Sequence, residues 1–122
     1  MSVFLPVFVQ MGFATGQNGN AINGKWKSED GDKKVQMEIY LAKDGKHYGK
    51  VINDTEKPAN NGRIAMKALA YNEKEKNYTG IMQPPDVNME LNITVTLETK
   101  DRLKVVARKL LMKKTMYFIR TD

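Results

Sequence analysis

Few side chains in this sequence could carry acid–base or metal chemistry. His47 is the single histidine and there is no cysteine, which excludes thiolate nucleophiles, disulfides and multi-histidine metal sites. A catalytic histidine needs a nucleophile and an orienting carboxylate, and none can be assembled around His47, which we expect on the surface or in a turn. The run Glu29-Asp30-Gly31-Asp32 lacks the spacing of a calcium loop. We therefore predict no enzyme, no metal site and no cofactor.

Positive charge is the second chemical feature of the chain. Twenty Lys and Arg residues face fourteen Asp and Glu, a formal net charge of +6. The basic residues concentrate toward the end of the chain, at Lys104, Arg108, Lys109, Lys113, Lys114 and Arg120. Such a face attracts anions, but no aromatic residues are interleaved with these cations to stack on bases. We expect a solvated outer face, no nucleic-acid partner and a monomer or weak dimer.

The first residues have the character of an export signal. Residues 3–13, VFLPVFVQMGF, match the length of a signal-peptide core and are too short to span a bilayer, so we expect no stable membrane insertion. The small residues Gly12 and Ala14 predict cleavage after Ala14, although the usual cationic start is missing. We expect residues 1–14 to be a signal-peptide remnant, residues 15–23 to be flexible and the mature chain to be periplasmic or secreted. A structural strand or helix is the alternative for this segment.

The positioning elements after Asn23 are strands. Apolar and polar residues alternate with a period of two, most clearly in residues 89–97 and in residues 35–41, which is typical of antiparallel strands with one buried face. The Asp44-Gly45 pair favours a tight hairpin between two of them. The eight expected strands are 25–28, 35–41, 47–53, 63–71, 77–82, 89–97, 103–110 and 115–120.

Short connections make these strands pair with their neighbours in sequence. Turns every 8 to 12 residues are typical of a sandwich or barrel, and Pro58, Pro84 and Pro85 place the two longer interruptions outside the sheet. Closing an eight-stranded meander removes its unpaired edges. We predict one all-β domain, residues 24–122, an antiparallel up-and-down barrel whose interior is filled by side chains or holds one small ligand.

Gly24-Lys25-Trp26 resembles the G-x-W signature of calycin barrels, the lipocalin and fatty-acid-binding superfamily. The sequence that follows resembles a family of small exported bacterial proteins of undetermined activity with a lipocalin-like barrel. The matching residues are Gly24, Trp26, Glu38, Ile39, Tyr40, Asp44, Gly45, Tyr48, Gly49, Lys50, Val51, Leu103, Lys104, Val105, Tyr117, Phe118 and Arg120. The resemblance implies that Arg120 stacks on Trp26 at the closed end of a barrel, a structural role, and it supplies no catalytic residue. Residues 83–88 depart from the family pattern, so the rim of the barrel is the least certain part of the likeness.

The best-patterned strands also yield a candidate ligand site. Their apolar faces carry methionines, whose flexible thioethers adapt to varied partners. The residues predicted to line the lumen are Met37, Ile39, Met66, Met89, Leu91 and Ile93. We expect an exported binding protein that holds a small apolar or amphipathic molecule; the alternative is a solidly packed barrel whose basic outer face binds an acidic partner.

Overall fold

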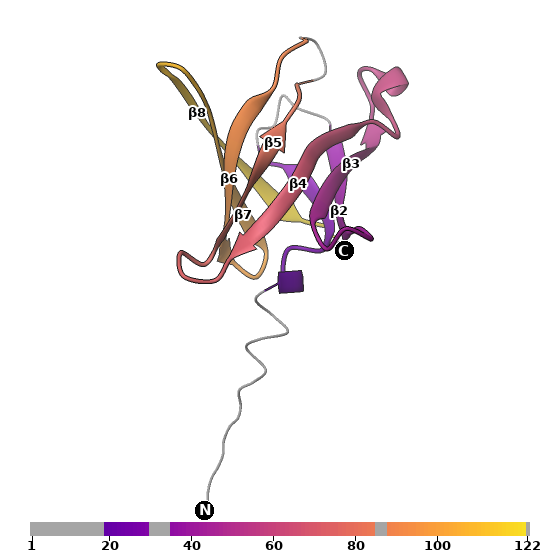
Figure 1. The fold of residues 1–122 in the computed structure, drawn as a ribbon. Coiled ribbons are helices and arrows are strands. Elements are labelled where there is room, and N and C mark those ends of the chain that lie inside the picture. Colours follow the sequence, from indigo (N-terminus) through magenta and orange to yellow (C-terminus); the bar gives the residue numbers. More distant parts are fainter. Residues whose placement is uncertain (1–18, 30–34, 85–87, 122) are drawn as a thin grey trace, which may run out of the picture.

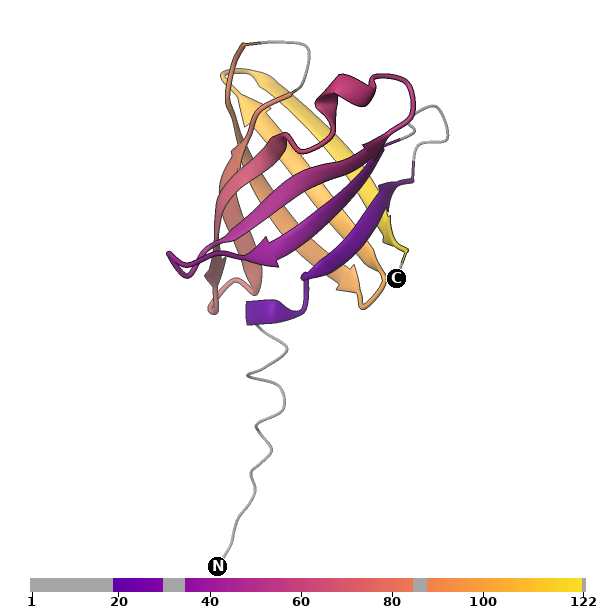
Figure 2. The same cartoon turned by 90° about the vertical axis from the view of Figure 1, so that its right-hand side faces the viewer.

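The computed structural model describes residues 19–29, 35–84 and 88–121, in which eight antiparallel strands close into one barrel (Figures 1 and 2). Each strand pairs with the next, and β8 pairs with β1 to complete the ring. The strands are β1 (Gly24–Ser28), β2 (Val35–Leu41), β3 (His47–Asp54), β4 (Ile64–Asn72), β5 (Asn77–Met82), β6 (Leu91–Thr99), β7 (Arg102–Lys109) and β8 (Met112–Arg120). The predicted all-β up-and-down barrel is confirmed.

Four predictions fall partly or wholly outside the described residues. The signal-peptide segment 1–14 and the start of the lead-in, residues 15–18, are among them. So is most of the acidic run, from Asp30 to Asp32, and so are residues 85–87 of the proline-containing loop. The structure therefore bears on none of these segments.

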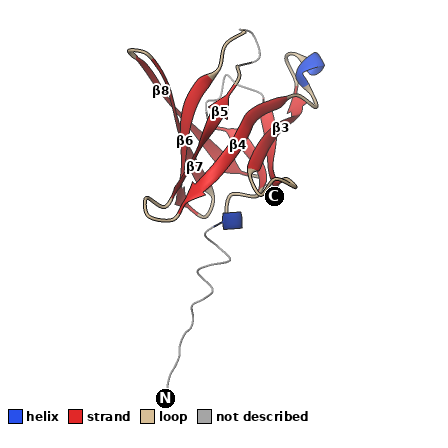
Figure 3. Cartoon of the chain, viewed as in Figure 1, coloured by secondary structure: helices blue, strands red, loops and turns tan. Residues whose placement is uncertain are grey.

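The strand boundaries follow the alternation, with two corrections. The strand β6 begins at Leu91, so Met89 precedes it rather than lying within it. The strand β8 begins at Met112, and Leu110 belongs to the two-residue turn between β7 and β8 rather than to β7. Between β3 and β4 the loop includes a single 3-10 turn, η2 (Pro58–Asn60), shown in blue in Figure 3.

The meander gives the barrel two distinct ends. Strands alternate in direction, so the β2–β3, β4–β5 and β6–β7 turns gather at one end, together with residues 19–23 (the lower end in Figure 1). The other end carries the β3–β4 and β5–β6 loops and the β7–β8 turn. We call them the closed end and the open end.

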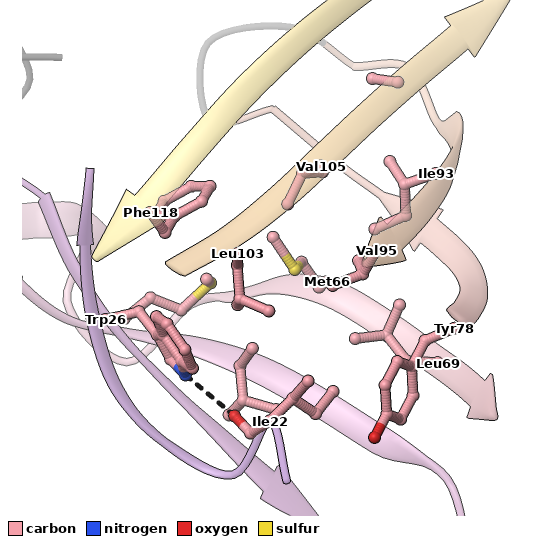
Figure 4. Packing of buried hydrophobic residues seen from close by; sticks show 13 residues of the cluster. Ile22, Trp26, Met66, Leu69, Tyr78, Ile93, Val95, Leu103, Val105 and Phe118 are labelled. Atoms are coloured by element: carbon pink, nitrogen blue, oxygen red, sulfur yellow. Dashed lines mark hydrogen bonds between the residues drawn. The ribbon is translucent and has the colours of Figure 1, made fainter. Parts of the chain in front are cut away.

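A continuous apolar core fills the closed half of the barrel (Figure 4). Trp26 and Leu103 are fully buried there, alongside Leu69 and Tyr78 from the other side of the barrel. The side chains that form this core are Ile22, Trp26, Met37, Ile39, Met66, Leu69, Tyr78, Ile93, Val95, Leu103, Val105, Ala107 and Phe118. Each of these side chains is at most 9% exposed, so the core is closed to solvent.

A bulge in β4 decides which of its residues enter the core. Met66 and Leu69 are both fully buried although they lie three residues apart, because Ala68 adopts a positive φ of 54° and the β4–β5 register shifts there. Gly80 of β5 permits the close approach. A Cβ atom at Gly80 would lie 2.6 Å from the carbonyl oxygen of Lys67, so we infer that this bulge requires glycine opposite it.

Residues 19–23 seal the closed end, which corrects the prediction that this part of the chain is flexible. Ile22 is fully buried against Trp26, and the Trp26 Nε1 donates a hydrogen bond of 2.9 Å to its carbonyl oxygen, the dashed line in Figure 4. The Tyr78 hydroxyl donates to the carbonyl oxygen of Gly19 at 3.0 Å. The segment is a plug held by side chains from the strands.

His47 is part of this plug, so the expectation of a surface or turn histidine was wrong. The side chain is only 4% exposed. Its Nδ1 lies 2.8 Å from the Asn23 Oδ1, and its ring meets the edge of Tyr78 at 5.5 Å between centroids. Burial lowers the pKa of His47 below 6.5, opposed by a hydrogen bond to the backbone of Gly19. The imidazole is therefore a neutral structural group.

A lowered histidine pKa makes stability depend on pH. Below the ordinary value near 6.5 the unfolded chain binds a proton that the folded chain resists, so acidification through this window should lower the free energy of unfolding. We expect the wild type to lose more stability than His47→Gln between about pH 8 and pH 5.5, a range above most carboxylate pKa values. Urea unfolding across this range is the measurement, and parallel pH profiles of the two proteins would contradict it.

Candidate ligand cavity

The open half of the barrel contains a cavity of about 630 Å³. Its walls come from seven of the eight strands, all except β4, and from the loops at the open end. The apolar residues that line it are Val35, Val51, Met82, Leu91, Ala107, Met116 and Phe118. A volume of this size lies within the usual range for sites that enclose small molecules.

Asp54 stands at the mouth of the cavity but is committed to the β3–β4 loop. Its carboxylate accepts hydrogen bonds from the Asn60 side chain and from the backbone amides of Glu56 and Lys57, at 3.0, 3.1 and 2.8 Å. These bonds, led by that from Asn60, lower the pKa of Asp54. The group is only 6% exposed, so it holds the loop in shape and is not free to act as an acid or base.

Arg63 joins two loops across the wall of the cavity. Its Nη2 donates to the carbonyl oxygens of Gln83 and Pro84 at 3.3 and 3.0 Å, which ties the start of β4 to the chain after β5. Its Nη1 is buried without a hydrogen-bond partner among the described residues. A buried donor without an acceptor lowers stability. The Nη1 of Arg63 could therefore donate a stabilising hydrogen bond to a ligand in the cavity.

The other charged residues at the mouth are Glu29, Glu56, Lys57 and Lys114. Glu29 forms a two-pronged ion pair with Arg102, with distances of 2.9 and 3.0 Å, and this partner lowers the pKa of Glu29. Lys114 lies across the β7–β8 ladder from Ala107 and lines the mouth. Within the described ranges neither Lys114 nor Arg63 is ion-paired with a carboxylate. The mouth can therefore offer positive charge to a ligand.

The predicted lumen residues divide between core and cavity. Met37, Ile39, Met66 and Ile93 face inward and belong to the core cluster, and none of them is among the residues that line the cavity. Leu91 lines the cavity. Met89 lies outside the core cluster and outside the cavity wall, because it precedes β6. The structure therefore brings five of the six into the barrel interior and places only Leu91 at the candidate site.

Sequence reasoning missed most of the cavity wall. Val35, Val51, Met82 and Met116 line the interior, and the last three belong to strands from which no lumen residue was predicted. A sequence signal was present for Val51 and Met82, which lie close to the two longest interruptions of the strand pattern.

The pair implied by the calycin likeness lies at the closed end, away from the cavity. The guanidinium of Arg120 lies over the Trp26 ring at 4.3 Å from its centroid. It also donates hydrogen bonds to the carbonyl oxygens of Asn23 and Ala21, both at 2.8 Å, and of Lys100 at 2.9 Å. Arg120 thus clamps the plug onto the barrel, and neither residue lines the candidate site.

A second depression, of about 520 Å³, lies on the outside of the barrel between Tyr40, Tyr48, Ile64 and Lys67. It is shallow and faces solvent, so it could not enclose a ligand. Among the described residues there is no group of three or more His, Cys, Asp and Glu side chains that could hold a metal ion. No helix in the described part of the chain has the length and apolar character needed to cross a membrane.

Comparison with known proteins adds no further assignment. No family model, no curated protein and no solved structure matches this chain.

Proposed function

We propose that this chain is a non-enzymatic β-barrel of the lipocalin-like kind that binds a small amphipathic molecule in the cavity of its open half. The observation that carries the proposal is an apolar cavity of about 630 Å³ with a sealed base and an open mouth. Apolar walls take up the oily part of a ligand by removing it from water. The polar part would remain at the mouth, near Arg63 and Lys114.

The titratable side chains near the plug and the cavity are engaged in structural hydrogen bonds and ion pairs, which supports a binding role over catalysis. His47 is neutral and built into the plug. Asp54 serves the β3–β4 loop, and Glu29 is paired with Arg102. Acid–base chemistry needs a group free to exchange a proton with substrate, and each of these groups already has structural partners.

The division of the interior also favours a ligand over the alternative of a solidly packed barrel. Part of the interior is packed by the core cluster, while Val51, Met82, Leu91 and Met116 line a cavity in the open half. A barrel needing only stability would fill both halves, since close packing stabilises the fold.

A series of straight-chain carboxylates of increasing length, titrated by calorimetry, tests the proposal. We expect one site per chain and an affinity that rises about fourfold per added methylene, which corresponds to about 0.8 kcal/mol of burial, until the cavity is full. Beyond that length the affinity should level off because further methylenes stay in water. Equal affinity for all lengths, or no saturable binding, would remove the cavity as a ligand site.

We also propose that the protein is exported and works in a periplasmic or extracellular setting. Cleavage after Ala14 would spare the plug, because residues 19–23 and the Tyr78 hydrogen bond to Gly19 lie after that position. Native mass spectrometry of protein purified from its own host reports both the first residue and any co-purifying ligand. A mature chain beginning at Thr15 is expected, and an intact Met1 in the folded protein would contradict export through this signal.

A further inference from the structure

The turn between β7 and β8 is apolar and fully exposed. Leu110 and Leu111 are 97% and 102% exposed, and Met112 is 67% exposed. The hairpin projects from the open end, at the upper left of Figure 1. Three large apolar residues at a projecting tip lose their contact with water only if something outside this chain covers them.

The residue types in this turn are unfavourable for the fold itself. The connection is two residues long, and such turns normally use Asn-Gly or Asp-Gly because the backbone enters the left-handed region. Here Leu110 adopts a φ of 55°, a conformation that costs a residue with a branched apolar side chain more than it costs Asn or Gly. Folding therefore does not explain two leucines at this position.

The strands next to the tip carry cations that also oppose folding. The register places Arg108 directly across from Lys113, and like charges in that position repel. Lys109 and Lys114 lie on the same hairpin, and Lys109 donates to the carbonyl oxygen of Glu90 at 3.2 Å. From Leu103 to Thr121 the sequence contains no acidic residue. The hairpin is thus an apolar tip beside four cations, none of which forms an ion pair within the described residues.

We propose that this hairpin docks the protein on an anionic lipid bilayer. Leu110, Leu111 and Met112 would enter the boundary between headgroups and acyl chains, and the four cations would meet the lipid phosphates. The tip is convex, so it suits a deformable apolar medium better than a protein surface, which would need a matching groove. Nucleic acid would satisfy the charges but would leave the leucines in water.

The orientation follows from the barrel topology. The tip and the mouth of the cavity lie at the same end, and Lys114 belongs to both. A docked barrel would therefore turn its mouth toward the lipid and its plug away from it. The docking inference rests on the tip and its charges, so it stands whether or not the cavity binds a ligand.

Co-sedimentation of the full chain with phosphatidylglycerol-containing vesicles and with phosphatidylcholine vesicles tests the inference. We expect binding to the anionic vesicles that weakens as salt is raised, because salt screens the charges. The double variant Leu110→Gly/Leu111→Asn should bind about tenfold more weakly or worse. It should melt at the same temperature as the wild type or higher, because glycine suits the positive φ of position 110 and the two leucine side chains are almost fully exposed.

The charge contribution has a matched control. Arg108→Ser/Lys113→Ser should weaken binding to anionic vesicles about tenfold or more, since each basic residue near such a surface contributes to attraction. Lys43→Gln/Lys74→Gln removes two exposed cations from turns at the closed end and should bind like the wild type. An equal loss in both double variants would show attraction by net charge alone and would overturn the docking geometry.

A local probe separates the tip from the apolar N-terminal residues, which all variants share. In Leu111→Trp the new indole should shift its emission to the blue on adding anionic vesicles and should be quenched by brominated lipid. Unchanged emission from this variant would overturn lipid docking. Displacement of the bound protein from vesicles by an acidic polypeptide, with no effect of salt on vesicle binding, would have the same consequence. Tighter binding to single-stranded DNA than to anionic vesicles would overturn it as well.

Discussion

Replacing Trp26 with alanine should lower the free energy of unfolding by about 3 to 5 kcal/mol, the usual cost of deleting a fully buried large aromatic side chain. Trp26 is completely buried in the closed half, and its indole is sandwiched between the core and the guanidinium of Arg120. Its Nε1 also holds Ile22 in the plug. Truncation therefore removes packing, a hydrogen bond and the surface on which Arg120 lies.

Urea unfolding followed by far-ultraviolet circular dichroism measures this effect. Trp26→Phe should recover part of the loss, because it restores an aromatic face but not the donor to Ile22. Lys27→Ala is the matched control on the same strand, where the exposed side chain should matter by no more than about 0.5 kcal/mol. A Trp26→Ala protein as stable as the control would show that the closed end does not depend on this residue.

The effects of Arg120→Ala and Trp26→Ala on stability should be coupled rather than independent. The stacking of Arg120 on the indole contributes about 0.5 to 2 kcal/mol, and its hydrogen bonds to the plug would also be lost in Arg120→Ala. Residues in contact do not contribute additively, so the double variant should cost less than the two single costs together. The same cycle, read by hydrogen exchange at Ile22, would report whether the plug detaches as a unit.

The fold was accessible from the sequence because local signals agreed with one another. In β2 and β6 the alternation of apolar and polar residues survives almost unbroken, so the inward face could be read directly. The Asp44-Gly45 pair marks a real hairpin in which Gly45 has a φ of 82°. Short connections then left a meander as the simplest topology, and the pairing of β1 with β8 closes it.

Features that depend on contacts between distant parts of the chain could not be predicted from the sequence. The bulge at Ala68 brings Met66 and Leu69 to the same face, against a period of two. His47 was predicted to be a turn residue because it follows Lys46, yet the plug covers it. The plug comes from residues before the first strand, which show no alternation of apolar and polar residues that could have predicted it. Polar and glycine-rich composition around Gly19 and Asn23 suggested a flexible lead-in for the same reason.

The site was predicted less well than the fold, for a geometric reason. Alternation states which residues face inward but not at which level of the barrel they lie. Ile39 and Val51 belong to paired strands and both face inward, yet one is in the solid core and the other lines the cavity. What separates the two levels is the size of the side chains that arrive from all eight strands, together with the sealing of only one end.

Ala107→Phe should weaken binding of an amphiphile in the cavity about 100-fold, which corresponds to losing the burial of three or four methylenes. Ala107 is 3% exposed, lines the cavity, and lies across the ladders from Ile93 and Lys114. A phenyl ring at this position would occupy the volume that the oily part of the ligand needs. Because Ala107 also belongs to the buried core cluster, the fold should lose about 1 to 3 kcal/mol, the usual cost of overpacking.

The decisive comparison is with Ala70→Phe, which adds the same ring to the exposed face of β4, where Ala70 pairs with Thr79. Both variants should keep the barrel, as judged by circular dichroism, and both gain equal apolar area. Only Ala107→Phe should lose the titration of the carboxylate series, because only it fills the interior. If Ala70→Phe weakened binding equally, the ligand would sit on the outer surface; if neither did, the cavity would not be its site. A block confined to Ala107→Phe would place the ligand in the open half, above the core that Trp26 and the plug stabilise.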